Sequence, residues 1–226
     1  MEALAVLWAP VRTLSRVAEE RRVLLAFGVT ALYAALGLVS GALVFVGGSL
    51  QEEFEAQGQP LPPGFEAFVA AFSVIAIVLA VLAPFVNWLL VAGLMHLVTR
   101  FFGGNGPFSG TLAVVGVAQA PLVVSSVLAI PLTGLQIALT PHDVAASGLA
   151  GGLVGLVSGL IGLAAFLWFA ALVVVGSSFA RRVGYGESAG SCAISCAGCF
   201  GLIIVVSVAI VALVAIVAGA SGWSGA

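Results

Sequence analysis

The sequence predicts an all-α, polytopic membrane protein: a bundle of five transmembrane helices preceded by a short N-terminal amphipathic interfacial helix. Three observations lead to this fold class. Of the 226 residues, 62% are hydrophobic and only 7% are charged, whereas about a quarter of a soluble domain is charged. Five apolar runs are long enough to cross a hydrocarbon core of roughly 30 Å. The charged residues lie between these runs, so we exclude a water-soluble globule.

Residues 1–22 form the predicted cytoplasmic arm. Pro10 suits the first turn of a helix, and beyond it apolar and charged side chains recur at helical spacing on opposite faces. Arg12 and Arg16 occupy the charged face. We expect this helix to lie in the membrane interface, with Trp8 as an anchor.

The predicted membrane domain, residues 23–220, contains five spans at about residues 23–46, 68–99, 111–139, 147–180 and 191–220. The second run is longer than a bilayer requires and carries Pro84 near its middle, where we expect a kink. The third run contains Pro121 and Pro131. Residues 221–226 form a predicted short external tail.

The basic residues predict the orientation of the chain. All seven are arginines: Arg12, Arg16, Arg21, Arg22, Arg100, Arg181 and Arg182. Five spans place every one of them on the same side, which the positive-inside rule assigns to the cytoplasm. The N-terminus is therefore predicted to be cytoplasmic and the C-terminus external. The arginines are scattered and form no stripe that would follow a phosphate backbone, so we predict no nucleic-acid binding.

Polar residues are rare inside the predicted spans, and no ionisable group lies at a span centre. Ion-coupled pumps and carriers need such groups, so this class is disfavoured. Four side chains are candidate buried polar groups: Asn87, His96, Gln119 and Gln136. Amides of this kind commonly form hydrogen bonds between membrane helices. The alternative is that they line the path of a polar substrate.

Three glycines, Gly151, Gly155 and Gly159, recur every four residues in the fourth span. Glycine has no side chain to hold two backbones apart, so this spacing predicts a face on which another helix packs closely. The partner is either another span of the chain or a second copy, and we expect a homo- or hetero-oligomer.

The cysteines Cys192, Cys196 and Cys199 have the spacing of the iron–sulfur motif in radical enzymes. Here they begin a long apolar helix and share one of its faces, so no loop surrounds a cluster. We predict a helix-packing seam, with copper(I) binding or lipid attachment as alternatives. The acidic residues of the first outer loop lack the spacing of a calcium loop. No metal and no cofactor are predicted.

The glycine-rich stretch at residues 102–108 lacks the Lys and Ser/Thr of a phosphate-binding loop and follows a membrane helix, so we interpret it as a tight cytoplasmic turn. No catalytic pair is apparent, and we predict that the protein is not an enzyme. The candidate partner surface is cytoplasmic: Trp8, Arg12, Arg16, Arg181 and Arg182.

The third span and the turn before it carry a resemblance to a known family. A Gly-Gly-x-Gly turn followed by a Gly-Tyr-x-x-x-Pro stretch is typical of the Yip family, the Ypt/Rab-interacting membrane proteins. Gly103, Gly104, Gly106, Gly116 and Pro121 match these motifs, with valine at position 117 in place of the tyrosine. The resemblance covers most of the chain and implies five spans with a cytoplasmic N-terminus.

Eukaryotic Yip proteins are associated with Rab-type GTPases and membrane trafficking. This chain lacks their long cytosolic N-terminal region and their Asp-Leu-x-Gly-Pro motif, so we do not carry GTPase binding over. It resembles the compact prokaryotic branch, which implies a location in the plasma membrane. We expect a non-enzymatic protein that organises protein and lipid partners through helix packing and cytoplasmic loops. The alternative is a transporter of a small neutral or lipidic solute.

Overall fold

The computed structural model describes residues 2–46, 65–138 and 144–220. Every regular element in these ranges is a helix, as the composition predicts. In chain order the helices are α1 (Glu2–Ala5), α2 (Pro10–Glu20), α3 (Val23–Val46), α5 (Phe65–Phe101), α6 (Phe108–Ala118), α7 (Ala120–Ala138), α8 (Val144–Arg181) and α9 (Tyr185–Ala220).

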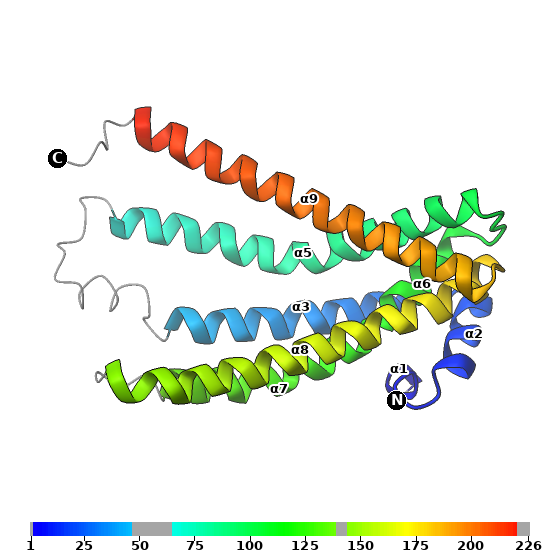
Figure 1. Cartoon of the computed structure of the whole chain (residues 1–226), viewed down its shortest axis with the longest axis horizontal. Coiled ribbons are helices and arrows are strands. Elements are labelled where there is room, and N and C mark those ends of the chain that lie inside the picture. The colour runs from blue at the N-terminus through cyan, green and yellow to red at the C-terminus, as the bar shows by residue number, and fades with distance from the viewer. Residues whose placement is uncertain (1, 47–64, 139–143, 221–226) are drawn as a thin grey trace.

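The long helices run along the longest axis of the molecule, and the short helices gather at one end (Figure 1). Helix α3 packs against α5 and α7, α7 packs against α8, and α9 packs against α5 and α8. Helices α2 and α6 lie at the end where α5, α8 and α9 converge, and the opposite ends of α5 and α9 diverge from α8. The tightest packing is therefore at the end that carries α2 and α6.

Four helical segments in the described part of the chain are long and apolar enough to cross a membrane: Val23–Leu43, Ile77–Phe101, Phe108–Ala138 and Gly151–Arg181. They overlap the first four predicted spans. The predicted fifth span falls in α9, where most side chains from position 200 onward lie outside the described residues. The predicted outer loops and external tail fall largely or wholly within residues 47–64, 139–143 and 221–226, which also lie outside them.

The third span consists of two helices that meet at Gln119. Helix α6 ends there, and α7 begins at Ala120 with Pro121 as its second residue. Proline has no N–H to donate, and its ring collides with the carbonyl four residues earlier, so an uninterrupted helix through this position is disfavoured. By contrast, Pro84 lies within the continuous helix α5, and the ribbon of α5 changes direction near its middle (Figure 1).

Helix α6 is the centre of the core. It is apolar on all sides, which is typical of a helix enclosed by others, and it contacts α2, α3, α5 and α8. Eight of its residues are buried: Gly110, Thr111, Ala113, Val114, Val115, Gly116, Val117 and Ala118. The remaining helices are thus arranged around a short central helix.

Two glycines allow the helices to approach α6 closely. A Cβ atom on Gly116 would stand 2.5 Å from the Cβ of Ala26 and 2.8 Å from the indole nitrogen of Trp88. That nitrogen donates a hydrogen bond of 2.8 Å to the carbonyl of Leu112. On the other side of α6, a Cβ on Gly176 of α8 would stand 2.1 Å from Cγ1 of Val114. Only a hydrogen fits at either position.

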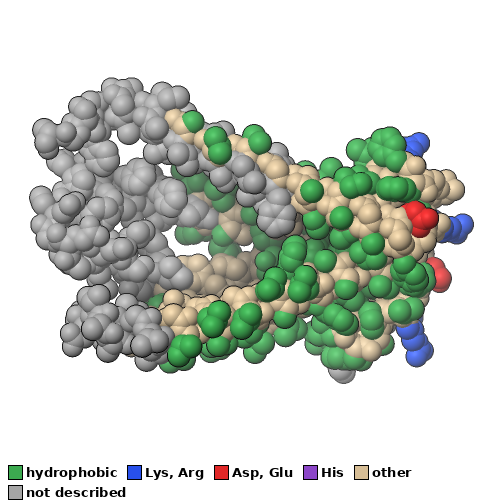
Figure 2. Space-filling model, in the orientation of Figure 1, with side chains coloured by type: hydrophobic (Ala, Val, Ile, Leu, Met, Phe, Trp, Pro, Cys, Tyr) green, Lys and Arg blue, Asp and Glu red, His purple; other side chains and the backbone are tan. Residues whose placement is uncertain are grey.

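The outer wall of the bundle is apolar. Large hydrophobic side chains on α3, α5, α7 and α8 are exposed, among them Leu24, Leu82, Leu128 and Leu160. Figure 2 shows hydrophobic side chains along the described wall, whereas the visible arginines and acidic residues lie at one end. A soluble protein does not expose so much contiguous apolar surface. The protein is therefore an integral membrane protein whose wall contacts lipid.

Replacing Gly116 with valine is expected to lower the free energy of unfolding by at least about 2 kcal/mol, because the added atoms overlap Ala26 and Trp88. The measurement is thermal unfolding of the purified protein in detergent micelles. Gly28→Ala on α3 is the control. No atom lies within 4 Å of its Cβ position, and alanine favours helix by up to about 1 kcal/mol. A Gly116→Val protein as stable as this control would contradict the packing described here.

Candidate functional site at the arginine-bearing end

A tight turn follows α5 and caps the last carbonyl groups of this helix. Gly103 has a positive φ of 82°, a conformation that glycine adopts without a steric penalty. The amide of Gly104 donates a 2.9 Å hydrogen bond to the carbonyl of Thr99, and the amide of Gly103 donates one of 3.1 Å to that of Arg100. This pair of bonds is the Schellman arrangement, which satisfies helix-end carbonyls and reverses the chain. The predicted tight turn is therefore present.

Arg181, the last residue of α8, holds this turn in place. Its Nε donates a 3.0 Å hydrogen bond to Oγ1 of Thr99, and its Nη2 donates one of 2.6 Å to the carbonyl of Gly104. Its Nη1 donates to the carbonyl of Gly106, and its own carbonyl accepts a 3.1 Å bond from the amide of Asn105. The guanidinium therefore connects α8 to the end of α5 and the start of α6. We call this set of contacts the arginine clasp.

The clasp requires glycine at two of the family-motif positions. A Cβ on Gly106 would stand 1.7 Å from the carbonyl oxygen of Ala180, and a Cβ on Gly104 would stand 2.9 Å from that of Thr99. Both glycines are buried. The Gly-Gly-x-Gly motif thus has a structural explanation: Gly103 provides the positive φ, and the other two glycines let the loop lie against α8.

The side chain of Arg181 is only 2% exposed, and no carboxylate among the described residues pairs with it. The prediction that Arg181 belongs to an exposed partner surface is therefore wrong. The physical reason is that the carbonyls of Gly104 and Gly106 and the hydroxyl of Thr99 supply the hydrogen-bond acceptors that a buried guanidinium needs. Its neighbour Arg182 is exposed.

Thr99 was not among the residues singled out from the sequence. It is fully buried, and its hydroxyl donates a 2.6 Å bond to the carbonyl of Met95 while accepting from Arg181. The only sequence signal is a hydroxyl residue just before a glycine-rich turn, which is too common to identify a partner in a helix that is distant in the sequence.

Helix α2 packs on the same end of the bundle. Leu14, Val17 and Ala18 are buried, and the helix contacts α6 and α8. The helix ends at Arg21 in the left-handed conformation, with φ of 51°. This side of α2 therefore packs against other helices and joins the arm to the core, whereas Val11 is 52% exposed.

A small ion network lies on the exposed side of α2. Nε of Arg16 is 2.7 Å from Oε1 of Glu20, and Nε of Arg22 pairs with the second carboxylate oxygen of Glu20. Hydrogen bonds from Arg16 and Arg22 lower the pKa of Glu20 below its usual value. Glu20 is therefore ionised at neutral pH.

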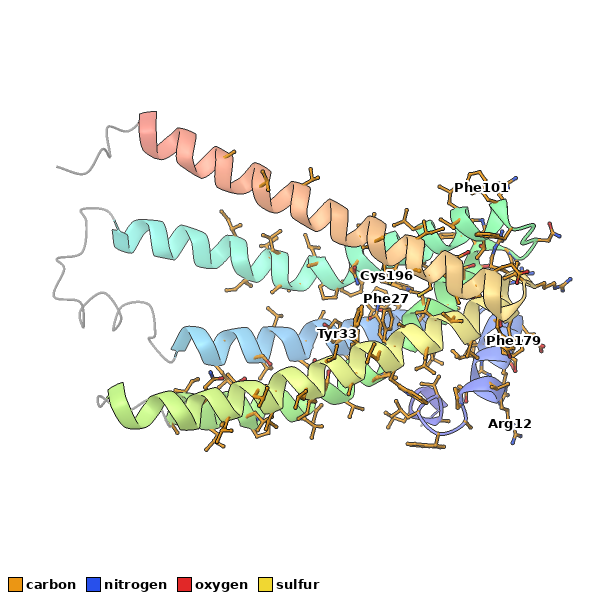
Figure 3. The ribbon with its side chains drawn as sticks, in the orientation of Figure 1. Arg12, Phe27, Tyr33, Phe101, Phe179 and Cys196 are labelled. Carbon is orange, nitrogen blue, oxygen red and sulfur yellow. The ribbon has the colours of Figure 1, made fainter. Side chains whose placement is uncertain are left out.

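The exposed residues at this end are arginines and aromatics. Trp8 is 72% exposed and Phe101 is 82% exposed, and Arg12 and Arg16 are also exposed. Figure 3 shows Arg12 projecting from α2 at the same end as Phe101. Aromatic and arginine side chains of this kind are typical of the membrane–water boundary.

The four candidate buried polar residues do not come together. Asn87 and Gln136 are exposed in the isolated chain, so the prediction that they are buried was wrong; the neighbouring helices leave their faces of α5 and α7 uncovered. Gln119 is 2% exposed, and its Oε1 has no hydrogen-bond partner among the described residues. His96 is half-buried, and its ring packs edge-on against Phe108 with centroids 5.3 Å apart. These residues do not line one buried path.

The two predicted packing seams differ. No atom lies within 4 Å of the Cβ positions of Gly151, Gly155 or Gly159, so no described helix of this chain packs closely on them. On α9, by contrast, the buried side chains are small: Ser188, Ser191, Cys192 and Ser195. Cys196 packs against the core, and Cys199 is half-buried.

Helix α9 is also joined to α8 by hydroxyl groups. The Oγ atoms of Ser177 and Ser188 are 2.7 Å apart, and Oγ of Ser188 donates a 2.7 Å bond to the carbonyl of Val174. Within the described ranges no group of three His, Cys, Asp or Glu side chains is placed to hold a metal ion.

Replacing Arg181 with methionine is expected to lower the free energy of unfolding by about 3 kcal/mol or more, because the carbonyls of Gly104 and Gly106 lose charged donors in a buried place. The measurement is the denaturation midpoint in a titration of sodium dodecyl sulfate. Arg182→Met, at the exposed next position, is the control and should change stability by about 0.5 kcal/mol or less. Equal effects at the two positions would refute the clasp.

The glycines of the turn should differ in their sensitivity to alanine. Gly103→Ala is expected to cost about 1–2 kcal/mol, the penalty for a side chain in the left-handed region. Gly106→Ala should cost more, because its Cβ would overlap the Ala180 carbonyl and the backbone must move. Thermal unfolding in micelles gives the order, and a smaller loss for Gly106→Ala than for Gly103→Ala would contradict it.

Comparisons with known proteins agree with the resemblance drawn from the motifs. The sequence model of the Yip1 domain matches residues 4–208. An uncharacterized protein of Methanocaldococcus jannaschii is 34% identical over 71 residues, which make up 31% of this chain and 50% of that protein. The chain thus spans about half the length of this curated relative. No solved structure matches the chain. Because the match to the Yip1 domain covers most of its length, the chain belongs to the Yip1 domain family.

Proposed function

We propose that this protein is a non-enzymatic membrane organiser, which gathers protein and lipid partners at its arginine-bearing end. The observation that carries the proposal is the rigid construction of this end. The arginine clasp fixes the turn at residues 102–107, and the buried face of α2 fixes the arm beside it. The exposed side chains of Trp8, Asn105 and Arg182 are therefore held on a preorganised surface, which lowers the entropy that binding must overcome.

The proposed orientation places this surface in the cytoplasm. All seven arginines lie in α2, in the residues that join it to α3, or at the ends of α5 and α8. Arginines near span ends are retained on the cytoplasmic side. A five-span topology, in which α9 is the fifth span, then puts the C-terminus outside. The family and the archaeal relative support a prokaryotic plasma membrane as the location.

The glycine row of α8 is the proposed surface for oligomer formation. Gly151, Gly155 and Gly159 are free of close contact with the described helices of the chain, and such a row permits a helix of another subunit to approach. The proposed surface for other partners consists of Trp8, Arg12, Arg16 and Arg182 and excludes the buried Arg181. The association of eukaryotic relatives with GTPases is not extended to this chain.

The test is photo-cross-linking in native membranes, with a photoreactive amino acid at Trp8 or at Asn105, followed by mass spectrometry. We expect a discrete protein adduct from both positions, because both are exposed on the proposed surface. The matched control is the same probe at Leu82 of α5, which is 51% exposed on the apolar wall and should yield lipid adducts. Lipid adducts alone from Trp8 and Asn105 would contradict a protein-organising role.

A further inference from the structure

A groove lies between the arm and the start of the first span. It has a volume of about 240 Å³ and is lined by residues of α1, of α2 and of the beginning of α3. Three arginines line it: Arg12, Arg16 and Arg22. Ala9 and Leu25 add apolar surface. The groove thus combines guanidinium groups with hydrocarbon, which suits a ligand that has an anionic part and an apolar part.

The charges in the groove do not balance. Glu20 pairs with both Arg16 and Arg22, whereas the guanidinium of Arg12 has no ion-pair partner among the described residues. The residues that line the groove include these three arginines and no acidic residue, so the lining carries an excess of positive charge. This excess attracts an anion, and the planar guanidinium groups match the oxygens of a phosphate in a bidentate manner.

The level of the groove relative to the first membrane span indicates which anion fits. Arg22 immediately precedes α3, and Leu25 is in its first turn, so the groove crosses the level at which the apolar span begins at Val23. Leu24, next to Leu25 in the first turn of α3, is 87% exposed, which places lipid at this level. The phosphate of a phospholipid lies at this level, directly above its glycerol and acyl chains. A soluble anion would make no use of Leu25.

We propose that this groove binds the phosphate group of an anionic phospholipid. Arg12 and Arg16 donate charge-assisted hydrogen bonds to the phosphate oxygens, and Ala9 and Leu25 contact the glycerol and the upper acyl carbons. This proposal rests on the membrane location of the protein. It does not require that the protein also organises protein partners. A basic pocket next to a membrane helix is a recurrent way of binding anionic headgroups.

The test uses the purified full-length protein in detergent micelles, titrated with phosphatidylglycerol or with phosphatidylcholine and followed by native mass spectrometry. We expect tighter binding of phosphatidylglycerol. Arg12→Gln and Arg16→Gln should each weaken that binding about fivefold, with little effect on phosphatidylcholine. Arg100→Gln removes the same charge from an exposed position outside the groove and should change the affinity by less than about twofold.

Arg12→Lys distinguishes a specific site from general attraction. It keeps the charge and loses the planar fork, so we expect a loss smaller than that of Arg12→Gln but larger than that of Arg100→Gln. Circular dichroism of each variant checks that the helices are intact. Because Arg12 is exposed and outside the core, we expect unchanged helix content.

Several results would overturn the proposal. Equal losses from Arg12→Gln and Arg100→Gln would mean diffuse attraction to charge, and equal binding of both lipids would mean no anion recognition. Displacement of phosphatidylglycerol by millimolar inorganic phosphate would assign the groove to a soluble anion. Failure of the cross-linking at Trp8 to capture a protein would count against the organising role alone, so the two proposals fail separately.

Discussion

The buried guanidinium of Arg181 is the interaction on which the rest of the structure depends. A charge without a carboxylate partner is costly in an apolar place unless acceptors surround it. Here the acceptors are the carbonyls of Gly104 and Gly106 and the hydroxyl of Thr99. Because these groups belong to the end of α5 and the turn before α6, satisfying one cation fixes three helices relative to one another.

The position of α6 follows from this arrangement. It begins directly after the clasped turn, is apolar on every side, and is enclosed by α2, α3, α5 and α8. In a bilayer the hydrophobic effect does not drive helices together, since lipid is as apolar as a core side chain, so association depends on close packing. Gly116 and Gly176 provide that closeness at opposite sides of α6. The absence of a side chain at Gly116 and Gly176 is therefore as important for helix packing as the side chains around them.

The end that carries α2 and α6 and the opposite end, where α5 and α9 diverge from α8, suggest different roles. At the arginine-bearing end, α2 is joined to the core through Leu14 and Val17, and its exposed face carries arginines that line the groove between the arm and α3. Towards the other end, the wall is apolar and helices α5 and α9 diverge from α8 (Figure 1). A surface for specific recognition needs fixed side chains, whereas a wall that faces lipid needs only apolar ones. This difference is why both proposals concern the end that carries α2 and α6.

The sequence alone determined the all-helical membrane class, the approximate positions of the first four spans, the tight turn and the family. Apolar run length and glycine spacing are local properties, and within a bilayer an apolar run must form a helix to satisfy its backbone hydrogen bonds. It did not determine which polar side chains are buried. Asn87 and Gln136 were expected inside and are exposed, whereas Arg181 was expected on the surface and is enclosed. Burial depends on which helix faces meet, and partners such as Thr99 and Arg181 are 82 positions apart in the chain. Only the tertiary structure brings such partners together, because no local pattern encodes a contact between distant helices.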